Sequence, residues 1–81
     1  ISEAIKLFFE ALEAEEKLNH THGMAQAYHN IGTAYYYLQD MPKTLEYLKK
    51  ALAIEEDLGN TEMIKKGYNN IGAIFFVLII L

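Results

Sequence analysis

The chain has 81 residues, of which 52% are hydrophobic, and it carries 11 acidic side chains against 7 lysines, with no arginine and no cysteine. This length allows one small domain with a thin core, and the apolar fraction is too high for a disordered segment. The net charge of −4 disfavours nucleic-acid binding, and the lack of cysteine excludes disulfides and thiolate zinc sites and favours a cytoplasmic location. Because the sequence opens with Ile1 and shows no signal sequence, it is interpreted as a fragment.

The first helix is predicted to begin after Ser2, which would cap it, and to end near Leu18. Its apolar residues recur at helical spacing: Ile5, Phe8, Phe9 and Leu12. The segment "NHTHG" interrupts this pattern. Thr21 is predicted to cap a second helix from His22 to Gln39, with an apolar side formed by Ala27, Tyr28, Ile31, Tyr35 and Leu38.

Asp40 is a suitable cap for a third helix, with Pro42 in the first turn, where its missing N–H costs little. This helix carries Leu45, Leu48, Leu52 and Ile54, and Gly59 suits the left-handed position after its end. Thr61 is predicted to begin a fourth helix that runs to the end of the chain.

The sequence repeats itself with a period of forty residues, most visibly in "YHNIGTAYYYL" (28–38) and "YNNIGAIFFVL" (68–78). The same offset aligns identical residues throughout: Ala11 with Ala51, Leu12 with Leu52, Glu15 with Glu55, Glu16 with Glu56, Leu18 with Leu58 and Thr21 with Thr61. One gap-free offset indicates a repeat array. The repeated glutamates are interpreted as the solvated ends of two helices.

This pattern resembles the tetratricopeptide repeat family. The first-helix spacing of aromatic, Leu-Gly and Tyr is matched by Tyr28, Ile31, Gly32 and Tyr35, and the second-helix pattern by Ala4, Phe8 and Ala11. The forty-residue period resembles the long-repeat subclass of that family. Gly32, Ala11 and Ala51 are expected where helices cross closely, with Tyr28 and Tyr35 filling the gaps beside the crossing. Two departures are Thr44 in place of the small alanine and Phe75 in place of Tyr35.

The resemblance implies an all-α fragment of an α-solenoid. Calling the first helix of each repeat A and the second B, the order is B, A, B, A. Residues 1–20 are the second helix of one repeat, 21–60 are one complete repeat, and 61–81 are the first helix of the next. Stacked hairpins of this kind form a concave wall, and the implied function is a protein-interaction scaffold with no enzymatic activity and no cofactor.

The residues opposite the apolar side of the A helices are predicted to line the concave wall and bind a peptide or partner protein. They are Gln26, Asn30, Thr33 and Tyr37, then Lys66, Asn70, Ala73 and Val77, with His29 and Asn69 beside them. Asn30 and Asn70 offer both a donor and an acceptor to a peptide backbone, although hydrogen bonding within the hairpins is an equal alternative. The carboxylate clamp of other tetratricopeptide domains needs an asparagine after the glycine. Thr33 and Ala73 stand there instead.

The sequence gives only weak signals for metal binding and for catalysis. His20, His22 and His29 suggest a zinc site, but the first two are not repeated and no third-ligand pattern accompanies them, so no metal is predicted. No set of serine, histidine and acid and no phosphate-binding glycine loop is present in the sequence, which argues against catalysis.

The tail "AIFFVLIIL" has nine consecutive apolar residues, fewer than the ~20 that cross a bilayer. The start of a membrane span is therefore a minor alternative. Without a helix to cover it, the last helix is predicted to self-associate into a homodimer or larger oligomer. The residues assigned to this contact are Ile71, Ile74, Phe75, Leu78, Ile79 and Leu81. A self-associating engineered or truncated fragment is thus the second functional interpretation.

Overall fold

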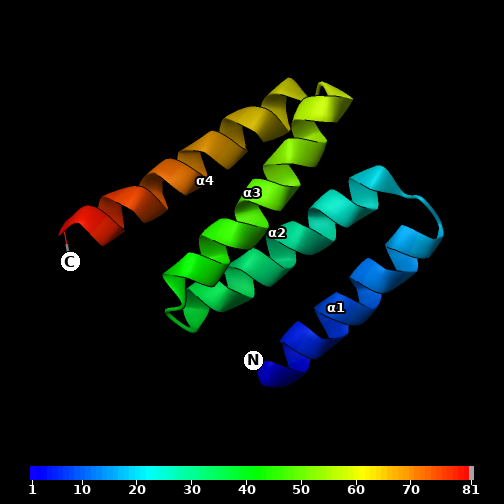
Figure 1. Ribbon diagram of the computed structural model, residues 1–81, viewed down its shortest axis with the longest axis horizontal. Coiled ribbons are helices and arrows are strands. Elements are labelled where there is room, and N and C mark those ends of the chain that lie inside the picture. Colours follow the sequence, from blue (N-terminus) through cyan, green and yellow to red (C-terminus); the bar gives the residue numbers. More distant parts are fainter. Residues whose placement is uncertain (81) are drawn as a thin grey trace.

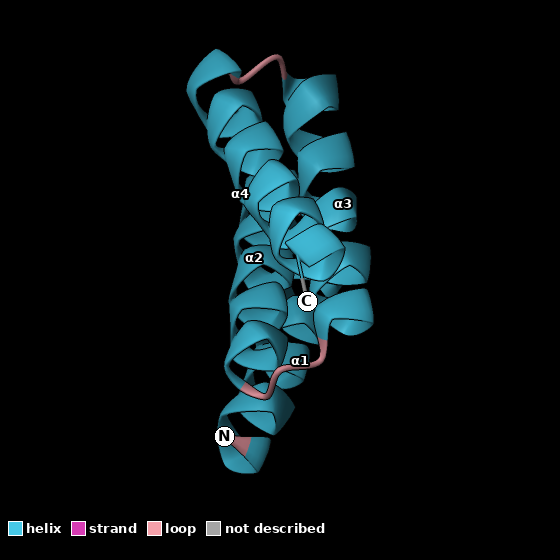
Figure 2. Cartoon of the chain, turned by 90° about the vertical axis from the view of Figure 1, so that its left-hand side faces the viewer, coloured by secondary structure: helices cyan, strands magenta, loops and turns pink. Residues whose placement is uncertain are grey.

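A computed structural model describes residues 1–80 as four helices in chain order: α1 (Ser2–Lys17), α2 (Thr21–Tyr37), α3 (Met41–Leu58) and α4 (Thr61–Ile80). Each helix packs against the one before it, so α1 and α4 form the two ends of the stack (Figure 1). The molecule is a thin slab with extents of 41 × 32 × 14 Å. Turned by 90°, it shows α2 and α4 toward one side and α3 toward the other (Figure 2). The predicted all-α stack of hairpins is confirmed.

The signals predicted around α3 are confirmed. The Asp40 side chain accepts a hydrogen bond from the backbone N–H of Lys43 at 3.1 Å, and Pro42 occupies the first turn. Gly59 ends the helix in the left-handed conformation with φ of 69°. The side chain of Asn60 then accepts from the backbone N–H of Met63 at 3.2 Å and so caps α4, which begins at Thr61 as predicted.

The caps predicted for the first two helices are wrong. Ile1 and His20 hold the N-cap positions of α1 and α2, and neither gives a capping side-chain hydrogen bond. The turns after α1 and α2 are closed by Asn19 and Gln39, which adopt positive φ angles of 56° and 63°. Asparagine tolerates this conformation better than most residues, whereas glutamine carries no local signal for it. The positive φ angles in the first two turns were therefore not predicted, because neither residue is a glycine and no proline follows directly.

The core consists of two clusters that share the interior of the stack. One lies between α1 and α2 around Leu12, Ala27 and Ile31, and the other lies between α3 and α4. The second cluster consists of Leu48, Leu52, Ile71 and Ile74. Ile71 and Ile74 are therefore buried inside the chain, and assigning them to an exposed self-association face was wrong. Leu81, the last residue assigned to that face, lies outside the described residues.

Gly32 lies where α2 crosses α3, as predicted. A Cβ atom placed there would lie 3.1 Å from Leu48 Cδ2, and Ala51 on α3 is fully buried. Gly67 allows a similar close approach of α4 to α3, since a Cβ there would lie 3.0 Å from Leu52 Cδ1. The repeat alignment did not predict this role of Gly67. Ala11, by contrast, is exposed, so its predicted role at a crossing is wrong.

Tyr47 on α3 fills the space beside the crossing together with the two predicted tyrosines. Its ring stacks on Tyr28 and Tyr35, with centroids 6.1 and 5.8 Å apart, and meets Phe9 of α1 edge-on at 5.7 Å. Lys50 lies over the Tyr28 and Tyr47 rings, adding a cation–π contact. These rings connect α1, α2 and α3 into one packed unit.

Replacing Gly32 with Leu tests the crossing. The new side chain meets Leu48 within a packed helix pair, so the free energy of unfolding is expected to fall by about 1–3 kcal/mol. Gly72→Leu is the matched control, because a Cβ at Gly72 meets no atom within 4 Å. Thermal unfolding at low protein concentration, followed by circular dichroism, compares the two. Equal melting temperatures for both variants would contradict the crossing.

Candidate functional site

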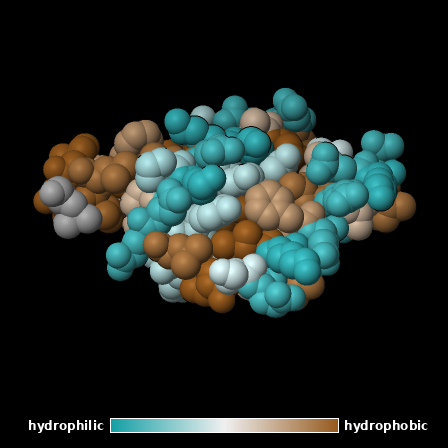
Figure 3. Space-filling model, turned by 60° about the horizontal axis from the view of Figure 1, so that its bottom comes forward, coloured by the Kyte–Doolittle hydropathy of each residue, from teal (hydrophilic) through white to brown (hydrophobic). Residues whose placement is uncertain are grey.

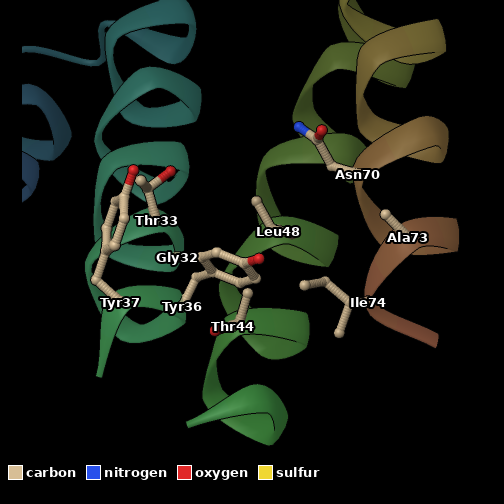
Figure 4. A pocket seen from close by; sticks show the side chains of 9 residues that line it. All are labelled: Gly32, Thr33, Tyr36, Tyr37, Thr44, Leu48, Asn70, Ala73 and Ile74. Carbon is tan, nitrogen blue, oxygen red and sulfur yellow. The ribbon is translucent and has the colours of Figure 1, made fainter. Parts of the chain in front are cut away.

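A hollow of about 260 Å³ opens between α2 and α4, with α3 as its floor. Thr33 and Tyr37 line it from α2, and Asn70 and Ala73 face them from α4 (Figure 4). The remaining lining residues are Gly32, Tyr36, Thr44, Leu48 and Ile74. The wall combines aliphatic side chains and the tyrosine rings with polar groups, which are the Thr33, Thr44 and tyrosine hydroxyls and the Asn70 amide. Such a hollow accepts an apolar side chain while the amide holds a nearby polar group.

A second hollow of about 250 Å³ opens between α1 and α2. Asn30, Thr33 and Tyr37 belong to its lining, so the two hollows adjoin along α2. Its other lining residues are Ile1, Ala4, Phe8 and Ala34. Asn30 is exposed, as Asn70 is.

The two hollows are the same site in successive repeats. The forty-residue offset carries five lining residues of the second hollow onto five of the first: Ala4 to Thr44, Phe8 to Leu48, Asn30 to Asn70, Thr33 to Ala73 and Ala34 to Ile74. Each repeat therefore presents one hollow with one asparagine at its rim. The repetition of the hollow cannot be recognised from one helix alone, because each hollow combines side chains from a B helix and from the A helix after it.

The other residues predicted for the concave wall occupy different surroundings. Gln26, Lys66 and Asn69 are exposed but line neither hollow, and Val77 is half-buried. His29 is half-buried, and its Nε2 atom is enclosed without a hydrogen-bond partner. The structure therefore brings Thr33, Tyr37, Asn70 and Ala73 together in one hollow and places Asn30 in the next.

Glu55 is a buried charge that sequence reasoning missed. Its side chain is 1% exposed and neither carboxylate oxygen has a hydrogen-bond partner, so its predicted place at a solvated helix end is wrong. His22 on α2 lies beside it, with its Nδ1 3.9 Å from Glu55 Oε1. Glu15, its repeat equivalent, is only half-buried and lies 3.0 Å from His20 Nδ1. The addition of α4 to the stack is what separates the two environments.

The histidine and glutamate side chains just described are also the candidate metal ligands, for which no metal site was predicted. Within residues 1–80, no group of three histidine, aspartate or glutamate side chains is arranged to hold a metal ion. His20 and His22 each lie beside a different glutamate, which divides the potential ligands between two places.

Stacked antiparallel hairpins of one repeated pattern define a helical repeat protein. The tetratricopeptide repeat family model matches residues 25–58, which cover most of α2 and all of α3, and so confirms the resemblance to this family over these residues. The assignment to the forty-residue subclass remains a prediction. No curated protein matches the chain.

The designed protein DA05, whose structure was solved by NMR in solution, is similar in fold. It superposes with a TM-score of 0.84 at 22% identity, over 90% of this chain and 73% of that one. At this identity the likeness concerns the fold alone.

His29 gives the fold a pH dependence that can be measured. Burial lowers the pKa of His29 below the ordinary value of 6.5; the Glu55 carboxylate opposes this effect and Lys66 adds to it. The folded histidine stays neutral where the unfolded one binds a proton, so unfolded chains bind more protons below pH 6.5. The contribution of His29 to stability is therefore complete above that pH and is lost as pH falls through the lowered pKa.

We expect the urea midpoint to fall between pH 7.5 and 5.5, and to fall less in the variant His29→Gln. His22→Gln is the control, because it removes another histidine near Glu55 and leaves His29 in place. An identical pH dependence in the parent and His29→Gln would show that His29 is not the titrating group.

Proposed function

We propose that the chain is a protein-interaction scaffold that binds an extended peptide segment across α2 and α4. The observation that carries this proposal is the pair of repeat-equivalent hollows, each with an exposed asparagine at its rim. An extended chain places successive side chains on opposite faces. Side chains on one face would enter the two hollows, while the Asn30 and Asn70 amides bond the peptide backbone.

The lining favours apolar or aromatic ligand side chains. Tyr37 borders both hollows, and Phe8 and Leu48 occupy equivalent positions in them. Tyr37 is 70% exposed, so a ligand that covers it would remove a large apolar surface from water. Recognition through shape and backbone hydrogen bonds needs no catalytic group or cofactor, and we propose a non-enzymatic, cytoplasmic role.

Substituting Asn30 and Asn70 with Ala tests the proposed contacts. The double variant is expected to lose about 1–3 kcal/mol of binding free energy without losing helicity, because both amides are exposed in the free protein. The ligand is a peptide selected against the parent chain from a display library, and calorimetry measures its affinity. Asn69→Ala is the matched control, since Asn69 is an exposed asparagine of α4 outside both hollows. Unchanged affinity in the double variant would remove these residues from the site.

A second candidate function, self-association through α4, is favoured by the exposed apolar side chains of that helix. Their exposed fractions reach 61% for Phe76 and 80% for Ile79, and Phe75, Leu78 and Ile80 are also exposed. Hydrophobic surface gathers at the left-hand end of the molecule in Figure 3, the end at which α4 finishes. By length and composition α4 could also cross a membrane, and membrane insertion is the weaker alternative.

Replacing Phe75, Leu78 and Ile79 with Lys is expected to convert an oligomer into a monomer, because charges on this surface oppose its burial. Sedimentation velocity at tens of micromolar gives the mass of both proteins. A parent chain that is monomeric at that concentration would exclude the second candidate.

A further inference from the structure

The two ends of the stack lack one neighbour each, and the missing neighbours differ. In the described residues α3 packs against both α2 and α4, whereas α1 lies against α2, with the Phe9 ring reaching Tyr47 of α3, and α4 lies against α3. By the repeat, α1 corresponds to α3 and α4 corresponds to α2. Helix α1 is thus a B helix without the A helix of its own hairpin, and α4 is an A helix without its B helix.

The open face of α4 consists of the repeat equivalents of residues that α2 packs on α3. Tyr28 and Tyr35 stack on Tyr47, and their equivalents Tyr68 and Phe75 are exposed. Gly32 is closed off by Leu48, whereas around its equivalent, Gly72, a Cβ would meet nothing within 4 Å.

The open face of α1 consists, in the same way, of the equivalents of residues that α3 packs on α2. Tyr47 becomes Leu7, which is 53% exposed, and the fully buried Ala51 becomes the exposed Ala11. Ala11 is exposed because none of the described helices packs on that face of α1, although the residue types of that contact are present there.

We propose that the chain associates head to tail, with α4 of one copy packing on α1 of the next in the geometry of α2 on α3. This inference rests on the self-association candidate above and names the surface that α4 uses. It replaces the symmetric contact between two α4 helices, in which Phe75 would meet Phe75 and the exposed Leu7 and Ala11 would stay uncovered.

The two faces match in shape at the helix crossing when placed in that geometry. Gly72 leaves room for Phe8, the equivalent of Leu48, and Phe75 comes to lie on Leu7 as Tyr35 lies on Tyr47. Glu62 takes the place of His22 and therefore comes to lie beside Glu15 of the next copy, which takes the place of Glu55. This like-charge pair opposes the contact.

The contact also completes the second hollow. The hollow between α2 and α4 has a wall from the preceding A helix, formed by Gly32, Thr33, Tyr36 and Tyr37. The hollow between α1 and α2 lacks this wall, since α1 is the first of the described helices. The equivalents on α4 are Gly72, Ala73, Phe76 and Val77. A neighbouring copy would supply these residues and continue the binding face from one molecule into the next.

A head-to-tail contact uses different surfaces on the two partners and need not close into a ring. The average mass is therefore expected to keep rising with concentration, whereas a symmetric dimer would level off at twice the monomer mass. Two blocked variants separate these possibilities: Leu7→Lys with Ala11→Lys on α1, and Gly72→Leu with Phe75→Lys on α4. The changed α1 residues are exposed, and Gly72 and Phe75 are also exposed, so each helical fold should persist by circular dichroism.

Each blocked variant alone is expected to be monomeric, and their equimolar mixture is expected to form a 1:1 complex in sedimentation velocity, because each retains the face the other has lost. The control Glu13→Lys makes the same change in charge as the α1 variant, at an exposed position of the same helix, and should still assemble.

Three outcomes would overturn the proposal. A monomeric parent would exclude it together with the self-association candidate. An α1 variant that still dimerises while the α4 variant does not would leave self-association standing and replace the head-to-tail contact with a symmetric one. Co-sedimentation of the parent with phosphatidylcholine vesicles, in place of self-association, would assign α4 to lipid.

Discussion

The close approach of α2 and α3 at Gly32 is the contact on which the rest of the structure depends. With no side chain at that point, Leu48 reaches the α2 backbone, and the space on either side is left for tyrosine rings. A hairpin so joined buries one face of each helix and leaves another open, because a helix in such a stack is apolar over more than one stripe. The open faces must be covered by the next hairpin, and that requirement produces an array.

The order of the helices and their class could be predicted from the sequence because the responsible signals are local. Asp40, Pro42 and Gly59 act within one turn of a helix end, and the forty-residue offset requires no knowledge of packing. Breaks were predicted at both of the first two turns, at "NHTHG" and before Asp40, but the positive φ angles of Asn19 and Gln39 were not. Nothing in a glutamine favours a positive φ.

The candidate site was predictable in part. Periodicity places Asn30 and Asn70 on the outer side of the A helices, but it cannot show that Ala4 and Phe8 contribute to the same hollow as Asn30, because that depends on how α1 lies against α2. The same limit explains why the burial of Glu55 was not predicted. Glu15 and Glu55 are identical in the alignment, yet only Glu55 lies on a helix covered from both sides.

The proposed binding and the proposed assembly depend on one property of the chain, which is that the surfaces proposed for them lie between helices. The hollow at Asn70 needs three helices, from α2 to α4, and it is walled on both sides. The hollow at Asn30 has two helices and an open side. If each repeat contributes only part of every site, then a ligand that spans both hollows is held more completely when a second copy closes the open one. Ligand binding and head-to-tail contact would then stabilise each other, because each completes a surface that the other uses.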